Sequence, residues 1–353
     1  MLYQTENQHG GDVYGGGITL DFSANTNPLG TPPGVLEAVC RALPRLHRYP
    51  DPYCRRLVQA ITGHEQVPAS YILCGNGAAD LIYTYCAALR PRTAVELAPT
   101  FVEYGAGLAQ VGCRVERYFL HQAQNFDLDE RFLSFLEEKK PEVVFLCNPN
   151  NPTGRLIPLP LLEQILQYCA AQGARLFLDE CFLDLTEDGV SAKSLLAAHP
   201  ELLILKAFTK SYGMAGIRLG YCLCADNALL RRMAAASPPW NVSSPAQSAG
   251  VAALAERDFL QRTLSLVHTE RRWLTDNLTA LGFWVCPSHA NYLLFRGPLG
   301  LREGLLQQGI AIRGCGNYNG LGDGWYRIAV RPHGENEALI TAIRQFCKEK
   351  SLW

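Results

Sequence analysis

The chain has 353 residues, 48% of them hydrophobic and 18% charged, which is enough for about two domains with a substantial core. Its 32 lysines and arginines nearly balance 33 aspartates and glutamates, and the net charge of -1 without blocks of like charge argues against a nucleic-acid partner. No stretch approaches the roughly 18 apolar residues that span a bilayer, and the polar first residues do not resemble a signal peptide, so we expect a cytoplasmic protein with no membrane partner.

The first 34 residues are rich in glycine, proline and asparagine, and we expect them to form an arm, residues 1–34, that packs with a small C-terminal domain. From about residue 70 to 245, short β-like runs alternate with amphipathic helical patterns such as 159–171. This alternation predicts a large domain, residues 35–245, with a mainly parallel sheet and helices on both faces. Its expected strands are 71–74, 93–97, 143–147, 175–179, 202–207 and 219–224.

After Pro245 a long helical pattern runs to about Leu281 and is expected to connect two domains. Strand-like segments follow at 283–286, 292–295, 310–313 and 326–330, with helical patterns near 301–308 and 335–348. Residues 246–353 are therefore predicted to hold an interdomain helix and a smaller α+β domain.

Thirteen cysteines are scattered from Cys40 to Cys347 without a CxxC pair, and most of them lie in apolar runs. This spacing favours reduced, buried thiols over disulfides or a metal site. We expect no metal ligands.

Ligands of open α/β sheets collect at the carboxyl ends of the strands, so the residues that follow each strand are informative. A small-residue turn at 75–79 opens a helix after the first strand, and its backbone N–H groups are suited to a phosphate, although a plain turn is the alternative. The run 148–154, Asn-Pro-Asn-Asn-Pro-Thr-Gly, follows the third strand, and its two X-Pro steps fix a turned backbone that places asparagines at the strand end.

Charged residues follow the next two strands. Asp179 and Glu180 end a buried-looking run, where a carboxylate needs a cationic partner, a cap or a salt bridge. Lys210 ends another apolar run, with Thr209 before it and Arg218 eight residues after it; neighbouring cations and burial lower a lysine pKa, which suits a Schiff base beside a phosphate. A ligand with an aldehyde, a protonated pyridine nitrogen, a phenolate and a phosphate would use all these features, and pyridoxal 5′-phosphate (PLP) is that ligand.

The combination of Asn-Pro-Asn-Asn-Pro-Thr-Gly, Asp179-Glu180, Thr209-Lys210 and Gly216-x-Arg218-x-Gly220, in this order, resembles the fold-type I PLP-dependent aminotransferase superfamily over nearly the whole chain. The resemblance implies an α/β fold of three parts. These are a large domain with a mainly parallel seven-stranded sheet, a smaller α+β C-terminal domain and an N-terminal arm.

The resemblance also implies roles for single residues. Lys210 would bind the cofactor aldehyde and carry a proton, Asp179 would pair with the pyridinium nitrogen, and Asn151 would bond to O3′. The cofactor phosphate would be bound by the main chain of Gly77 and Ala78 with Thr209 and Arg218, and Phe101 would stack on the ring, with a core position as its alternative. Tyr49 resembles the tyrosine that reaches the phosphate from the other subunit, which implies a homodimer with shared sites.

Phe182 departs from the aminotransferase pattern, which carries tyrosine three residues after the pyridinium-binding aspartate. Within the superfamily, further segments resemble the L-threonine-O-3-phosphate decarboxylase family of the cobalamin pathway, which Phe182 also fits. These segments are 9–11, 21–30, 48–51, 67–70, 101–105, 290–294, 312–321 and 326–331. The implied reaction converts L-threonine O-3-phosphate to (R)-1-amino-2-propanol O-phosphate and carbon dioxide.

Two arginines and a histidine suit such a doubly anionic phospho-amino acid. In this interpretation Arg327 binds the carboxylate, Arg313 and His9 bind the phosphate, and Asn27 belongs to the same site. Arg331 is a further auxiliary candidate.

Two other functions are compatible with these motifs. Histidinol-phosphate aminotransferase shares the cofactor site and a phosphate-bearing amine, but Phe182 and the arm at 9–11 count against it. A non-catalytic sensor or regulator with a PLP fold is disfavoured because Lys210 and Asp179 are both present.

Overall fold

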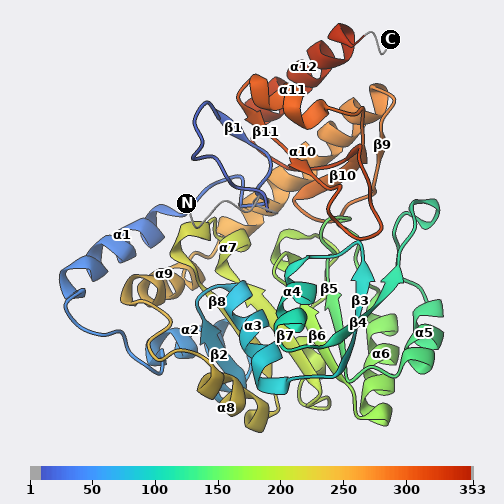
Figure 1. Ribbon diagram of the computed structural model, residues 1–353. Coiled ribbons are helices and arrows are strands. Elements are labelled where there is room, and N and C mark those ends of the chain that lie inside the picture. Colours follow the sequence, from blue (N-terminus) through green and yellow to red (C-terminus); the bar gives the residue numbers. More distant parts are fainter. Residues whose placement is uncertain (1–8, 351–353) are drawn as a thin grey trace.

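Seven strands form the central sheet of the large domain in the computed structural model, which describes residues 9–350 (Figure 1). The order across the sheet is β2(Ile72–Gly75), β8(Gly220–Cys224), β7(Leu202–Ala207), β6(Arg175–Asp179), β5(Val143–Cys147), β3(Thr93–Ala98) and β4(Arg114–Phe119). Among these described strands, β8 alone runs in the opposite direction to the other six. The mainly parallel seven-stranded sheet is therefore confirmed.

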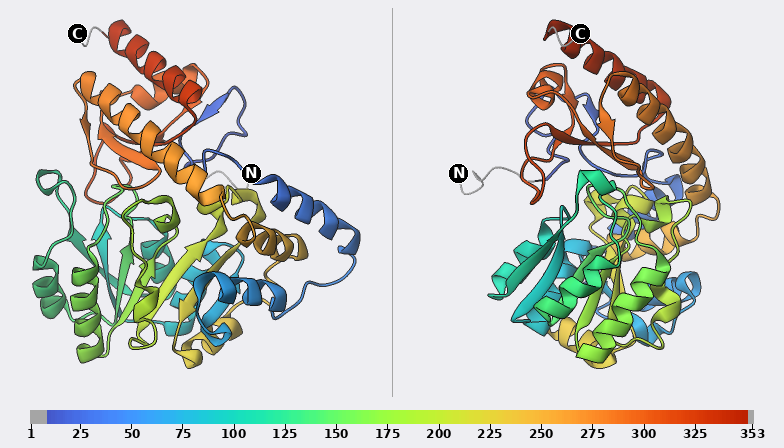
Figure 2. Two further views of the ribbon diagram at one scale, coloured as in Figure 1. Left: turned by 180° about the vertical axis from the view of Figure 1, so that it is seen from behind. Right: turned by 90° about the vertical axis from the view of Figure 1, so that its right-hand side faces the viewer.

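Helices cover both faces of this sheet, as Figure 2 shows in its edge-on view. Apolar side chains of one face pack with α2(Arg55–Glu65), α5(Arg131–Lys139) and α6(Leu159–Gln172). Those of the other face pack with α3(Ala78–Leu89), α4(Glu103–Gln110) and α8(Asn227–Ala236). Burial on both faces explains why β5 is apolar at every position and why β7 is apolar at every position except Lys206.

The sequence prediction missed β4. Its residues Arg114, Glu116 and Arg117 are charged, and the strand is only partly buried because it closes one edge of the sheet. Charged residues on an edge strand hinder pairing with other chains, and they also hide the apolar alternation by which strands are recognised.

The smaller domain holds an antiparallel sheet in the order β12(Arg313–Gly314), β13(Trp325–Ala329), β10(Tyr292–Arg296) and β9(Trp284–Val285). Its helices are α10(Phe259–Ala280), α11(Leu301–Gln307) and α12(His333–Glu349). In the arm, β1(Leu20–Asp21) pairs in parallel with β11(Ile310–Ala311), and Phe22 is buried in the small domain's core. The arm is thus attached to the small domain and passes between both domains (Figure 1).

The long helical pattern after Pro245 forms two helices, α9(Ser244–Leu254) and α10, rather than one. They pack against different partners: α9 lies against α1(Pro33–Ala42) and α2, whereas α10 contacts β9, β10 and α12. The expected boundaries at 34/35 and 245/246 fall inside α1 and α9. We propose that the domains divide after α9, where the packing partners change.

All thirteen cysteines are unpaired, and most are buried. Within residues 9–350, no three or more His, Cys, Asp or Glu side chains gather as metal ligands would. The helices of this same part of the chain are all too short or too polar to cross a membrane.

Candidate active site

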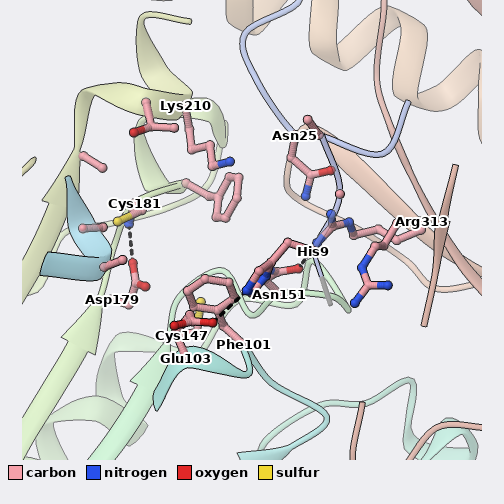
Figure 3. A pocket seen from close by; sticks show the side chains of 18 of the residues that line it. His9, Asn25, Phe101, Glu103, Cys147, Asn151, Asp179, Cys181, Lys210 and Arg313 are labelled. Atoms are coloured by element: carbon pink, nitrogen blue, oxygen red, sulfur yellow. Dashed lines mark hydrogen bonds and ion pairs between the residues drawn. The ribbon is translucent and has the colours of Figure 1, made fainter. Parts of the chain in front are cut away.

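A cavity of about 380 Å³ opens where the carboxyl ends of β5, β6 and β7 face the small domain and the arm. It brings together most of the residues expected from the sequence, and Figure 3 shows Lys210 and Asp179 on one side and Arg313 on the other. The expected residues that line it are His9, Ala78, Phe101, Asn151, Asp179, Thr209, Lys210, Arg218, Arg313 and Arg327.

Lys210 is held at the cavity wall by a short helix, α7(Phe208–Ser211), that follows β7 directly. Burial, with the positive charges of Arg327 and Arg218, lowers the pKa of Lys210 to about 8. Its Nζ atom lies 5.5 Å from the centre of the Phe182 ring. Attack on an aldehyde requires the neutral amine, and the lowered pKa increases its fraction near neutral pH.

Asp179 ends β6 and is 5% exposed. Its carboxylate accepts hydrogen bonds from the backbone N–H of Cys181 at 2.9 Å and the Tyr104 hydroxyl at 2.6 Å. Burial raises the pKa of Asp179, because these neutral donors offset only part of the cost of a buried charge. A cationic group of a ligand would stabilise the ionised form.

The three asparagines after β5 have different environments. Asn148 accepts from the Ile157 N–H, while Asn150 accepts from Thr100 and donates to the Pro99 carbonyl, so both side chains fix the loop. Asn151 alone of the three lines the cavity, where its Oδ1 accepts a hydrogen bond from Arg327. This bond fixes the orientation of the Asn151 amide.

The amino end of α3 meets Arg218 at one end of the cavity. Gly77 precedes the helix with φ of +86°, and a Cβ there would lie 2.9 Å from Nη2 of Arg218. A Cβ on Gly220 would likewise meet the Ala78 nitrogen at 2.9 Å. Close backbone approach, helix N–H groups and a guanidinium together form a site for a phosphate.

Phe101 lies on the cavity wall with its ring edge-on to Tyr104, their centres 5.6 Å apart. Arg327, on β13, is 6% exposed; it also donates to the Ser23 carbonyl at 2.8 Å, and its buried Nε contacts no hydrogen-bond acceptor of residues 9–350. Arg313 donates to Asn317 at 2.8 Å. Two guanidinium groups thus face one cavity from the small domain.

The expected Asn27 does not line this cavity. Its Nδ2 donates to the Ser211 carbonyl and the Thr263 hydroxyl, and its Oδ1 accepts from the Leu29 N–H. These hydrogen bonds give the Asn27 side chain a structural role. Asn25, two residues earlier, lines the cavity where Asn27 was expected. It is 1% exposed, and neither of its polar side-chain atoms bonds to residues 9–350.

Two other candidates also lie away from the cavity. Tyr49 is 77% exposed and stacks on Trp240, with ring centres 4.5 Å apart. Arg331 binds Glu335 of α12 at 2.9 Å.

Sequence reasoning assigned no role to several residues that line the cavity. These are Ser23, Ala24, Asn25, Glu103, Cys147, Cys181, Ala207 and Tyr318. Asn25 and Glu103 lie within segments that carry the family resemblance, 21–30 and 101–105. Their polar side chains in these segments could have marked them as candidates for the site.

Comparison with known proteins identifies the family. The family model for aminotransferase class I and II matches residues 18–346. The chain belongs to this family. This membership confirms the expected fold-type I enzyme and its cofactor, PLP.

Relatives in this family carry two different activities in their names. Threonine-phosphate decarboxylase from Salmonella typhimurium is 40% identical over 92% of this chain and 90% of its own. Histidinol-phosphate aminotransferase from Geobacillus sp. is 33% identical over 96% of this chain and 93% of its own. The structure of histidinol-phosphate aminotransferase from Clostridium acetobutylicum superposes with a TM-score of 0.87, at 28% identity, covering 94% of this chain and 99% of the other.

The cavity of this family member fits PLP by its own chemistry. It offers a lysine with a lowered pKa, a buried carboxylate bound by neutral donors, and a glycine cradle beside an arginine. An aldehyde, a protonated ring nitrogen and a phosphate complement these three features.

Proposed function

We propose that this chain decarboxylates L-threonine O-3-phosphate to (R)-1-amino-2-propanol O-phosphate and carbon dioxide with the help of PLP, in cobalamin biosynthesis. The observation that carries the proposal is the 40% identity, over 92% of the chain, with a threonine-phosphate decarboxylase. The cavity supports it, because Arg313, Arg327 and His9 suit a substrate with two anionic groups.

The proposed cofactor contacts are those that the family resemblance implies, and the lining of the cavity supports them. Lys210 holds the aldehyde, Asp179 keeps the ring nitrogen protonated, and Asn151 donates to O3′. The phosphate is bound by the Gly77–Ala78 main chain with Thr209 and Arg218, and Phe101 packs against the ring. When bound, PLP supplies an electron sink for the bond that is broken at the substrate's Cα.

The proposed substrate contacts come from the small domain and the arm. Arg327 binds the carboxylate, while Arg313, His9 and Asn25 bind the phosphate. Contacts at both ends of a small substrate fix which Cα bond is presented for cleavage. After carbon dioxide leaves, Lys210 delivers a proton to Cα, and its lowered pKa makes such a transfer accessible near neutral pH.

The deciding experiment is a product assay with purified, PLP-loaded protein and L-threonine O-3-phosphate, without an added oxo acid. We expect carbon dioxide and aminopropanol phosphate in equal amounts, and no product from Lys210→Ala. The proposal fails if the wild-type protein releases neither product. Glutamate formed from histidinol phosphate and 2-oxoglutarate would then assign the chain to the aminotransferases, which the 33% identical relative represents.

We propose further that the enzyme is a homodimer in which Tyr49 contributes to the partner's cofactor site. Exposed apolar side chains support this proposal: Leu36 on the projecting α1 (Figure 1), Leu46, Tyr49 and Tyr53 in the segment that follows α1, and Trp240, which stacks on Tyr49, are 45–77% exposed. Mixed dimers of Tyr49→Ala and Lys210→Ala chains test it, because one of their two sites would be intact. Activity should reappear on mixing; two inactive chains that stay inactive although they form mixed dimers would contradict shared sites.

A further inference from the structure

Glu103 is a carboxylate at the cavity that the proposed function leaves without a role. It begins α4 of the large domain and lines the cavity, with a side chain that is 16% exposed. Both of its oxygens are engaged. Oε1 lies 2.7 Å from Nε2 of His9 (Figure 3), and Oε2 accepts a hydrogen bond from the Tyr83 hydroxyl at 2.6 Å.

A carboxylate at the cavity wall repels an anionic substrate, so Glu103 is expected to have another role there. The hydrogen bond from His9 lowers the pKa of Glu103, so the carboxylate stays ionised. Burial and the same carboxylate raise the pKa of Tyr83 to about 12, so the phenol stays a hydrogen-bond donor. Glu103 is therefore a fixed anion, and its Oε1 lies within hydrogen-bond distance of the His9 imidazole.

The two partners of this contact come from different parts of the molecule. His9 belongs to the arm, and the next residues are seated closely: a Cβ on Gly10 would lie 2.1 Å from the Ser23 carbonyl oxygen, and the Gly11 N–H donates to the Ser23 hydroxyl at 2.8 Å. That carbonyl also accepts a hydrogen bond from Arg327. The arm is thus attached to the substrate-facing side of the small domain, and the His9–Glu103 contact ties it to the large domain across the cavity.

We propose that Glu103, supported by Tyr83, is a positioning residue that holds the His9 imidazole over the cavity for the phosphate group of the substrate. The inference rests on the proposed function. Because Glu103 acts through His9 on the phosphate end, its removal weakens substrate binding and leaves the bond-breaking step unchanged.

The test compares Glu103→Gln, His9→Ala and the double variant in steady-state decarboxylation of L-threonine O-3-phosphate. We expect each single variant to raise KM about tenfold, the usual size for one charge-assisted hydrogen bond, while kcat changes less than about twofold. The double variant should be no worse than His9→Ala, because both substitutions remove one interaction. Glu142→Gln is the matched control, since Glu142 forms a 2.7 Å ion pair with Arg92 at the amino ends of β5 and β3, opposite the carboxyl ends where the cavity opens, and should leave KM unchanged.

A backbone variant gives a second line of evidence that does not alter the charge. Gly10→Ala forces residues 9–11 away from Ser23 and should raise KM like His9→Ala, whereas Gly15→Ala, with no atom within 4 Å of its Cβ, should not. The proposal is overturned if Glu103→Gln keeps the wild-type KM, lowers kcat instead, or adds fully to His9→Ala.

Failure of the proposed function can be told apart from failure of this inference. If the wild-type protein does not decarboxylate L-threonine O-3-phosphate, calorimetric dissociation constants for that compound and for histidinol phosphate replace KM in the same comparison. Weaker binding in Glu103→Gln and His9→Ala, without additivity, upholds the positioning role; equal binding in wild type and Glu103→Gln overturns it.

Discussion

The lowered pKa of Lys210 makes a quantitative prediction about how the protein takes up its cofactor. At pH 7, an amine with a pKa of about 8 is neutral in about one molecule in ten, compared with about one in 3,000 for a pKa of 10.5. The protein environment thus raises the reactive fraction by about 300-fold. The rate constant for capture of PLP by cofactor-free protein should rise tenfold per pH unit below pH 8 and level off above it.

Stopped-flow absorbance on mixing PLP with cofactor-free protein measures this rate. N-α-acetyl-lysine gives the pH dependence of the cofactor itself, and Lys210→Ala should show no capture. Arg327→Gln should move the plateau to higher pH, because Arg327 is the largest charge that disfavours protonated Lys210. Arg331→Gln, which alters a salt bridge on α12, should leave the plateau in place. A wild-type rate that keeps rising tenfold per unit up to pH 10 would refute the lowered pKa.

Two further predictions concern the cofactor cradle and a buried charge cluster. Gly77→Ala should weaken PLP binding at least tenfold, because its φ is +86° and the added Cβ meets Arg218; Gly63→Ala, with open space around its Cβ, is the control in the same titration. Lys206→Met should lower the free energy of unfolding by about 3–5 kcal/mol in a urea titration, because this lysine is 5% exposed and is the shared counter-ion of Glu65, Glu180 and Asp184. Lys193 also pairs with Glu65 but is more exposed, so Lys193→Met should lower the free energy of unfolding by less than about 1 kcal/mol.

The sequence allowed the prediction of those parts of the site that the sheet itself assembles. Asp179, Asn151 and Lys210 each follow an apolar run, and parallel strands bring their carboxyl ends to one edge. The apolar pattern of each strand was sufficient to predict these three residues, because the position of each depends only on the strand that precedes it.

The arm was harder to predict because its contacts span most of the chain. Asn25 and Asn27 are two residues apart in one irregular segment, and nothing local distinguishes them. Asn27 donates hydrogen bonds to Ser211 and Thr263, which are 184 and 236 residues away, whereas Asn25 lines the cavity. The role of Asn27 was therefore decided by domain packing.

The two carboxylates of the cavity show how charge selects the ligand. Glu103 already accepts hydrogen bonds from His9 and from the Tyr83 hydroxyl, so both of its oxygens have partners within the protein when a ligand arrives. Asp179 accepts hydrogen bonds from the neutral Cys181 N–H and Tyr104 hydroxyl, and although these donors and the charge of Lys210 favour the ionised carboxylate, burial still raises the pKa of Asp179. A cation brought by the ligand would stabilise the carboxylate further. A ligand that carries a cationic ring nitrogen at Asp179 and anionic groups at the arginines satisfies the whole cavity. A neutral analogue of the same shape would leave Asp179 uncompensated and bind weakly for that reason.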